Sequence, residues 1–334
     1  MTPETSHLLT DGRYQIAVRQ SLAAGTLGPI VLEPVERRYE NALAALLSRM
    51  GLSAVGFEAG HVTVLTFDHW RRLVPAVKWE PIDGLVESLR IIKDDQEVLT
   101  LRRGAALLSG VAQTLSDWIR IDRTELDIAR EIDRALHAAG FSDPAFPTIV
   151  AAGPNSAHPH ARPTSRRLEA GDLVLLDFGG VLDGYCVDLT RMAALGRVSP
   201  EHQSLFDAVR EAEVAAFAAV RPGVEASEVD RAARDVLTSR GFGDAFVHAT
   251  GHGLGLEVHE RPRVGRAPES TTAGDAPATD GSDRVEKLAA GMVFTIEPGA
   301  YVEHLGGVRL EDDVLVTASG CEVLTTAPRQ LMIL

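Results

Sequence analysis

Several carboxylate side chains and one histidine in the C-terminal half of the chain lie inside short apolar segments with the composition of strands. Burying a carboxylate among apolar groups costs free energy unless a cation or hydrogen bonds compensate its charge. Two divalent cations would compensate several such groups at once, because carboxylates can bridge two ions about 3.5–4 Å apart. The residues that this hypothesis joins are Asp177, Asp188, His252, Glu297 and Glu311.

This ligand set also indicates which metals and which reaction to expect. Oxygen-rich sites suit Mn²⁺ or Co²⁺ better than structural Zn²⁺, which prefers Cys and His. Two ions would generate hydroxide near neutral pH and stabilise the tetrahedral intermediate of amide hydrolysis. We therefore predict two divalent metal ions, with Mn²⁺ as the first choice and Co²⁺ or Zn²⁺ as alternatives.

The two aspartates flank a predicted tight turn at Leu182-Asp183-Gly184. An antiparallel hairpin would bring Asp177 and Asp188 together, where they would repel unless one is protonated or a cation lies between them. Taken alone, an aspartate more often stabilises a turn than binds a metal ion. The pair is therefore the stronger signal.

The segment HATGHGLGLEVHE carries His248, His252 and His259 among several glycines. The glycines argue against a helical two-histidine zinc motif and favour a turn and strand that approach a site closely. A lone histidine is usually only a satisfied polar residue. Three histidines beside glycines make a functional site an equal alternative.

The two glutamates differ in how well they can be explained without a site. Glu297 follows apolar Phe294 and Ile296 and is expected at the end of a buried strand. Strand alternation places Arg309 and Glu311 on one face, where they could share the site or form only a surface ion pair. For Glu297 a surface ion pair is not plausible.

The elements that must position these residues alternate in type. Two helices, then strands, then two more helices and further strands indicate an α+β fold with a sheet covered by helices on one face and two similar halves. Thr124 and Asp127 form a predicted capping box. The expected helices cover residues 91–120, 124–140, 199–220 and 226–241, and the strand-like segments cover residues 147–153, 172–195, 291–303 and 307–325.

We expect two domains, residues 1–90 and 91–334. In the first, residues 8–18 are predicted to form two strands around the Asp11-Gly12 turn, residues 39–51 an amphipathic helix ended by Gly51, and residues 53–60 a short buried strand. Residues 267–282 have low complexity and few large apolar groups, so we expect a flexible insertion there.

The composition excludes several classes of protein. The chain has 334 residues, 45% hydrophobic and 24% charged, which is typical of an ordinary globular protein. The net charge of −14 argues against a nucleic-acid partner. No apolar run approaches the roughly 20 residues of a membrane span, and no signal peptide is visible. Only Cys186 and Cys321 are present, so a reducing cytoplasm is the expected location.

Together, the segments LLDFGG, CVDLTR, HATGHGLGLEVHE, FTIEPGAY and GGVRLEDD resemble the metal-binding blocks of the pita-bread metallopeptidases. That family includes methionyl aminopeptidase, Xaa-Pro aminopeptidase and prolidase, and the resemblance covers roughly residues 90–334. It implies the pita-bread fold, a curved, mostly antiparallel sheet covered by two helix pairs. A shortened α/β domain would precede it.

The resemblance also implies a role for each ligand. Asp177 would chelate one ion, His252 and Glu297 would hold the other, and Asp188 and Glu311 would bridge the two. Glu297 would also act as the general base that takes a proton from the bridging water.

Further pocket residues follow from the same resemblance. The segment NSAHPHARPT resembles the block around a catalytic histidine, which alignment through Asn155 assigns to His160, with His158 as the alternative register. His259 and His248 resemble the remaining pocket histidines, which contact the scissile amide and the substrate.

Arg309, two residues before Glu311, resembles the proline-specific branch rather than methionyl aminopeptidase and would contact substrate. The implied reaction removes the N-terminal residue from peptides with proline at the second position. Two alternatives stay open: a prolidase that cleaves only Xaa-Pro dipeptides, and a non-catalytic peptide-binding module on the same fold.

The segment LLTDGRY resembles the middle of the N-terminal domain of this branch rather than its start. We therefore expect roughly the first half of that domain to be absent. In the family this domain contributes to dimer contacts and limits substrate size, so a homodimer stays an open alternative. A half domain would expose strand edges and apolar surface.

Overall fold

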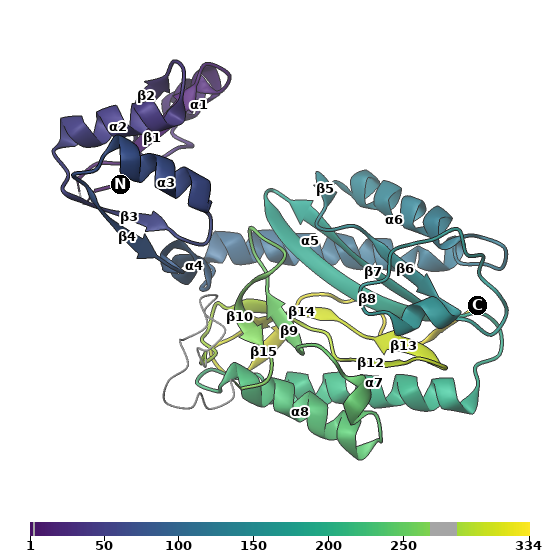
Figure 1. Ribbon diagram of the computed structural model, residues 1–334. Coiled ribbons are helices and arrows are strands. Elements are labelled where there is room, and N and C mark those ends of the chain that lie inside the picture. The colour runs from purple at the N-terminus through teal and green to yellow at the C-terminus, as the bar shows by residue number, and fades with distance from the viewer. Residues whose placement is uncertain (3, 268–285) are drawn as a thin grey trace. The chain divides into compact units, whose positions relative to one another are not determined.

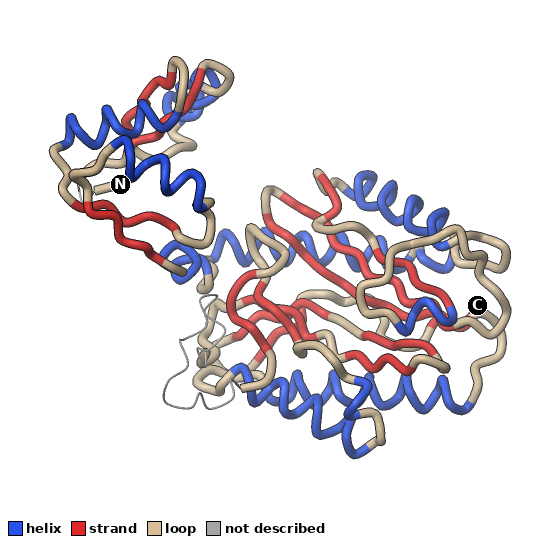
Figure 2. The backbone as a smooth tube through the Cα atoms, viewed as in Figure 1, coloured by secondary structure: helices blue, strands red, loops and turns tan. Residues whose placement is uncertain are grey.

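The computed structural model describes residues 1–2, 4–267 and 286–334. The described chain divides into two compact units, Met1–Leu85 and Val86–Leu334. Figure 1 labels their elements and Figure 2 separates helices from strands along the backbone. Residues 268–282 of the predicted insertion lie outside the described residues. The expected flexibility of this insertion therefore stays a prediction.

The first unit alternates strands and helices, and its strands pair in parallel, β1 with β2 and β3 with β4. The predicted hairpin over residues 8–18 is wrong, because the chain after Asp11 turns into a helix and β1 pairs with a later strand. The Asp11 carboxylate accepts a hydrogen bond from the backbone N–H of Arg13 within that turn. The elements are β1 (His7–Asp11), α1 (Gln15–Ala24), β2 (Val31–Val35), α2 (Tyr39–Met50), β3 (Ala54–Glu58), α3 (Val64–Leu73) and β4 (Lys78–Ile82).

The structure contains the other two elements predicted for this unit, the helix over residues 39–51 and the strand over residues 53–60. Helix α2 is confirmed and ends at Gly51, whose positive φ of 65° favours glycine. Strand β3 is also present, but its side chains alternate between exposed and half-buried, so it is not the buried strand that we predicted.

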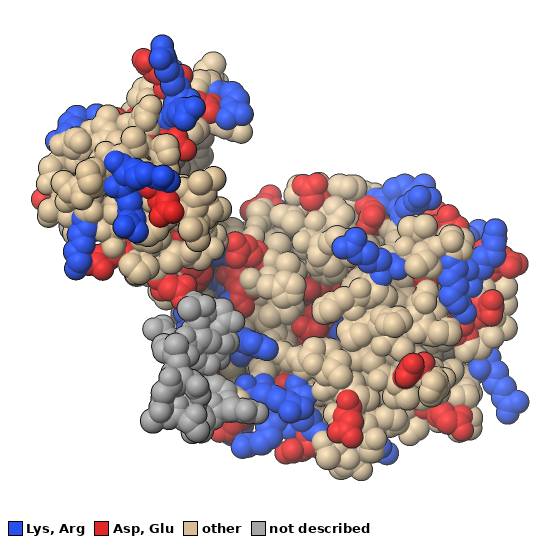
Figure 3. Space-filling view, in the orientation of Figure 1, with Lys and Arg blue, Asp and Glu red and all other residues tan. Residues whose placement is uncertain are grey.

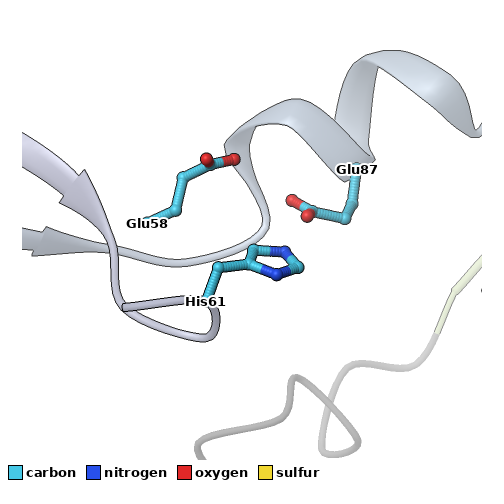
Figure 4. A group of neighbouring side chains, drawn as sticks. All are labelled: Glu58, His61 and Glu87. Carbon is cyan, nitrogen blue, oxygen red and sulfur yellow. The ribbon is translucent and has the colours of Figure 1, made fainter. Parts of the chain in front are cut away.

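The sequence passes from the first unit to the second within helix α4 (Leu85–Arg90). Figure 4 draws three polar side chains, two from the first unit and one from the second. Glu58, the last residue of β3, and His61 in the turn after it belong to the first unit, whereas Glu87 of α4 belongs to the second. Glu58 and His61 are exposed, so water can solvate both polar side chains without a bound ion.

Both predicted helix pairs of the second unit are present. Capping boxes start the first pair: Asp94 caps with Glu97, and Thr124 caps with Asp127 as predicted. The helices are α5 (Asp95–Gln113), α6 (Glu125–Ala139), α7 (Pro200–Ala219) and α8 (Ala226–Ser239), with short 3₁₀ turns at Leu115–Asp117, Gly153–Ala157 and Gly243–Ala245.

A long antiparallel hairpin forms the centre of the first half of this unit. Strands β7 (Leu173–Leu182) and β8 (Tyr185–Ala194) are joined by Asp183-Gly184, both with positive φ, which is the tight turn predicted from the sequence. Helices α5 and α6 pack against this half. Its other strands are β5 (Asp143–Pro144), β6 (Ile149–Ala152) and β16 (Met332–Ile333).

The second half is a five-stranded sheet in the order β10-β9-β11-β14-β15 together with the hairpin β12-β13, all antiparallel within the described residues. Helices α7 and α8 pack on it, so each half carries one helix pair, and the strands lie between the two pairs (Figure 1). The strands are β9 (Gly251–Gly253), β10 (Glu260–Val264), β11 (Val293–Ile296), β12 (Gly299–Val302), β13 (Gly306–Arg309), β14 (Asp312–Val316) and β15 (Cys321–Val323).

Helix hydropathy and surface charge indicate which kinds of partner the protein could contact. Among the described residues, no helix has the length and apolar character of a membrane span. On the face shown in Figure 3, Lys and Arg lie interspersed with Asp and Glu. The described residues on that face therefore form no continuous basic surface of the kind that binds nucleic-acid phosphates.

Candidate metal centre and active-site pocket

The β7–β8 hairpin places the two aspartates on one face. Asp177 lies opposite Thr190 and Asp188 lies opposite Gly179, so strand alternation directs both aspartates to the same side. On the other side, Phe178 belongs to the core cluster that includes residues of α5 and α6. The helices thus cover one face of the hairpin and leave the aspartates on the opposite face.

His252 lies between two glycines of β9 that allow close backbone contacts. A Cβ at Gly251 would collide with the backbone oxygen of Thr295, and a Cβ at Gly253 with that of Arg261. This explains why the predicted turn and strand, rather than a helix, carries the histidine. The glycines bring β9 against both neighbouring strands.

The orientation of the His252 ring indicates a cation site. Its Nδ1 lies 3.1 Å from the backbone oxygen of Gly253 and therefore donates, which leaves the Nε2 lone pair free. This Nε2 lies 3.3 Å from Oε1 of Glu297 and 4.0 Å from Oδ2 of Asp188. Burial lowers the pKa of His252, which favours the neutral imidazole. A neutral imidazole whose Nδ1 is fixed by a backbone oxygen and whose Nε2 lone pair faces two carboxylates has the arrangement of a metal ligand.

Glu297 and Glu311 approach Asp188 and His252 from segments of the second half of this unit. Glu297 follows the end of β11, and its backbone N–H donates to the oxygen of Thr250 at 2.7 Å. Glu311 bridges to Thr190 of β8, whose hydroxyl donates to its Oε2 at 2.6 Å. Ligand atoms of Asp188, His252 and Glu311 all lie within 4.8 Å of one another.

The electrostatics of the cluster fit bound cations. Burial, followed by repulsion from neighbouring carboxylates, raises the pKa of Asp188 and of Glu311 well above the usual range. Burial also raises the pKa of Glu297. Among the described residues, Oδ1 of Asp177 is buried without a hydrogen-bond partner. Divalent ions would relieve the repulsion and supply the missing partner, so these residues fit a metal centre.

Arg309 connects the centre to its surroundings. Its Nη2 donates to Oδ2 of Asp177 at 2.5 Å, and its Nε donates to the hydroxyl of Thr190 at 3.1 Å. Its Nη1 donates to the hydroxyl of Tyr301 at 2.6 Å. Arg309 and Glu311 therefore share the site, as one of our alternatives predicted, but the ion pair is with Asp177.

His248 and Tyr301 continue this chain of hydrogen bonds. His248 Nδ1 lies 2.8 Å from the backbone oxygen of Ala249 and donates to it, so Nε2 accepts from the Tyr301 hydroxyl at 3.0 Å. Burial lowers the pKa of His248 and raises that of Tyr301 to about 12. The imidazole is thus neutral and the phenol protonated. Tyr301 lies in FTIEPGAY and Thr190 in CVDLTR, but no local pattern in the sequence predicted a role for either side chain.

A single cavity of about 560 Å³ brings the predicted residues together. His259 lies beside the centre, with 4.1 Å between its ring centroid and that of His252, and burial lowers its pKa. His160 lines the cavity, whereas His158 is not among the lining residues, which favours the first register. The predicted site residues in the lining are Asp177, Asp188, His252, Glu297, Glu311, His160, His259, His248 and Arg309.

The sequence of this region matches a known family. The sequence of residues 100–318 matches metallopeptidase family M24, and that of residues 1–92 matches the creatinase/prolidase N-terminal domain. The chain belongs to metallopeptidase family M24. As a member it is a metal-dependent hydrolase, and the resemblance stated from the sequence is confirmed.

Relatives and solved structures agree with this assignment. The Xaa-Pro dipeptidase of Pyrococcus furiosus is 35% identical over 255 residues, which cover 76% of this chain and 69% of that protein. The solved Xaa-Pro dipeptidase from Bacillus anthracis has a TM-score of 0.90 at 32% identity and covers 100% of this chain and 88% of that one. The solved X-Pro aminopeptidase from Thermotoga maritima has a TM-score of 0.85 at 29% identity, with coverages of 100% and 89%. The predicted pita-bread fold of this metallopeptidase is confirmed.

Proposed function

We propose that this metallopeptidase hydrolyses the peptide bond before proline at the N-terminus of peptides and releases the first residue. The observation that carries the proposal is the free Nε2 of His252, which faces Glu297 and Asp188 in a cavity lined by further carboxylates. The proline preference rests on Arg309 before Glu311 and on the relatives described above, which are named Xaa-Pro dipeptidases and an X-Pro aminopeptidase.

We propose that the five predicted ligands divide between two metal ions. Asp177 would hold one ion, His252 with Glu297 the other, and Asp188 with Glu311 both. We propose Mn²⁺, with Co²⁺ or Zn²⁺ as alternatives, because the ligands are mostly carboxylate oxygens. When bound, such ions lower the pKa of water and polarise a carbonyl oxygen.

The side chains of the pocket perform the remaining steps. Glu297 would act as the general base that takes the proton of the attacking water and later gives it up. His160 and His259 lie along the cavity, where they would contact the scissile amide and assist collapse of the tetrahedral intermediate. His248 and Arg309 would bind the peptide, with Tyr301 fixing their orientation.

The cavity wall also contains apolar side chains. Phe146, Pro147 and Ile149 line it together with the catalytic groups. Apolar walls of this kind exclude water and can bury a pyrrolidine ring. A prolyl residue beside the scissile bond is therefore compatible with the pocket.

A second candidate is a dipeptidase that accepts only Xaa-Pro dipeptides, which is favoured by the similarity to the Xaa-Pro dipeptidases of Pyrococcus furiosus and Bacillus anthracis. The test compares Ala-Pro with Ala-Pro-Gly on Mn²⁺-loaded protein. Cleavage of both supports the aminopeptidase, cleavage of Ala-Pro alone supports the dipeptidase, and cleavage of neither contradicts both. A cytoplasmic location and a homodimer stay predictions.

A further inference from the structure

Glu125 is a buried carboxylate that none of the steps above uses. It is the first residue of α6, and its exposed fraction is 0%. A carboxylate at this depth must be compensated by strong hydrogen bonds or by a cation. Glu125 has the former, and its partners point to a role.

Among the described residues, the hydrogen bonds to the carboxylate of Glu125 all come from donors on one segment of the chain, residues 152–164. Oε1 accepts from the backbone N–H of Ala152 at 2.8 Å and from the side-chain amide of Asn155 at 3.0 Å. Oε2 accepts from the backbone N–H of Thr164 at 2.9 Å and from its hydroxyl at 2.7 Å. One side chain therefore joins the two ends of the segment 152–164.

The middle of this segment forms hydrogen bonds with strand β13 of the second half. The hydroxyl of Ser156 accepts from the backbone N–H of Gly307 at 2.9 Å, and the backbone oxygen of Pro159 accepts from Nη1 of Arg309 at 3.2 Å. His160 follows Pro159 and lines the cavity. The segment is thus held at its ends by Glu125 and at its middle by β13.

We propose that Glu125 is a positioning residue that fixes the segment 152–164 and, through it, the place of His160 in the pocket. This inference rests on the proposed function for its catalytic consequence, but the anchoring itself does not. Among the described residues, every hydrogen bond to the Glu125 carboxylate comes from an N–H or O–H group, so an amide at this position would turn a donor toward donors. An amide variant should therefore loosen the segment although its shape is nearly the same.

The experiment uses the full chain with Mn²⁺ as the metal and Ala-Pro as the substrate. Glu125→Gln is compared with Glu131→Gln, a matched change on the same helix at a half-buried residue that pairs with Arg123 and Arg134. We expect Glu125→Gln to speed amide hydrogen exchange in residues 153–163 but not in β7 and β8. We also expect kcat to fall about 10- to 100-fold, because small misplacements of a catalytic group cost this much. Mn²⁺ content should be unchanged, since the segment holds no proposed ligand.

Coupling to His160 is tested by the double variant Glu125→Gln/His160→Ala. If Glu125 acts through His160, the double variant is no slower than His160→Ala alone. If the losses of kcat caused by Glu125→Gln and by His160→Ala multiply in the double variant, the proposed link to His160 is overturned. Unchanged exchange in residues 153–163 would overturn the anchoring, even if the protein proved inactive on Xaa-Pro peptides and the proposed function failed.

A milder variant keeps the test decisive if Glu125→Gln does not fold. Thr164 is exposed, and Thr164→Val removes the hydroxyl that donates to Oε2 of Glu125 and accepts from the backbone N–H of Arg166. The same changes in exchange and kcat are expected at smaller amplitude. Exchange and kcat equal to those of the unmodified protein would overturn the proposal.

Discussion

Arg309 and Asp177, 132 residues apart in sequence, form a buried ion pair with 2.5 Å between Nη2 and Oδ2. The pair uses only one oxygen of the carboxylate. Among the described residues the other oxygen, Oδ1, is buried without a partner. Asp177 can therefore be held by the protein on one side and bind a cation on the other.

Replacing Arg309 by Met should destabilise the metal-free protein, because Asp177 would lose its charge partner while buried. Breaking a buried pair of this kind costs about 3–5 kcal/mol of unfolding free energy. Arg103→Met is the control, since its partner Asp183 lies 3.3 Å away and both side chains are exposed, 59% and 63%. That change should cost about 0–1 kcal/mol. Urea unfolding of both variants measures the difference, and equal losses would contradict a structural role for the buried pair.

Replacing Glu297 by Gln should remove turnover while the fold is retained. The amide cannot take a proton from water, and loss of a general base lowers kcat about 10²–10⁴-fold. Glu297→Ala should have at least the same effect. Glu303→Gln, at an exposed position after β12, is the control and should leave kcat unchanged. Steady-state kinetics on Ala-Pro decide, and near-normal activity of Glu297→Gln would reject the assigned base.

The stability of the metal-free protein should fall as pH rises from about 4. The folded pKa values of Asp188 and Glu311 are raised, so the folded state holds protons that the unfolded state has released. Their contribution is complete below the ordinary pKa of the carboxyl groups and is lost toward the raised values. Urea midpoints across this range should therefore decline for metal-free protein.

Two comparisons check this explanation. Added Mn²⁺ should reverse the decline, because bound cations favour the ionised carboxylates. Asp188→Asn should flatten it, since one of the repelling charges is gone. A metal-free protein whose stability rises steadily over this range would show that the carboxylates do not repel as described.

The ligand-bearing hairpin could be predicted because its signals are local. Asp183-Gly184 adopts positive φ at both residues, and the two-residue turn alone sets the register that faces Asp177 and Asp188 to one side. The N-terminal Asp11-Gly12 pair gave the same signal but led into α1. There the pairing of β1 with β2, across an intervening helix, determined the structure.

Other features depend on assembly of the two halves. Strand alternation correctly grouped Arg309 with Glu311, but the partner of Arg309 lies on a distant strand that no local pattern identifies. Tyr301 likewise acts only because β12 brings it to His248 and Arg309. For β3, apolar composition indicated burial, yet its side chains remain half-exposed within a small unit.

Metal content measured together with activity tests the central claim most directly. The protein is stripped with a chelator, reconstituted with Mn²⁺, and its bound metal and Ala-Pro hydrolysis are measured beside those of His252→Ala. We predict two ions per chain and activity in the reconstituted protein, no activity in the stripped protein, and less metal in His252→Ala. A well-folded protein that binds no Mn²⁺, Co²⁺ or Zn²⁺, or that hydrolyses Ala-Pro equally well after stripping, would contradict the account.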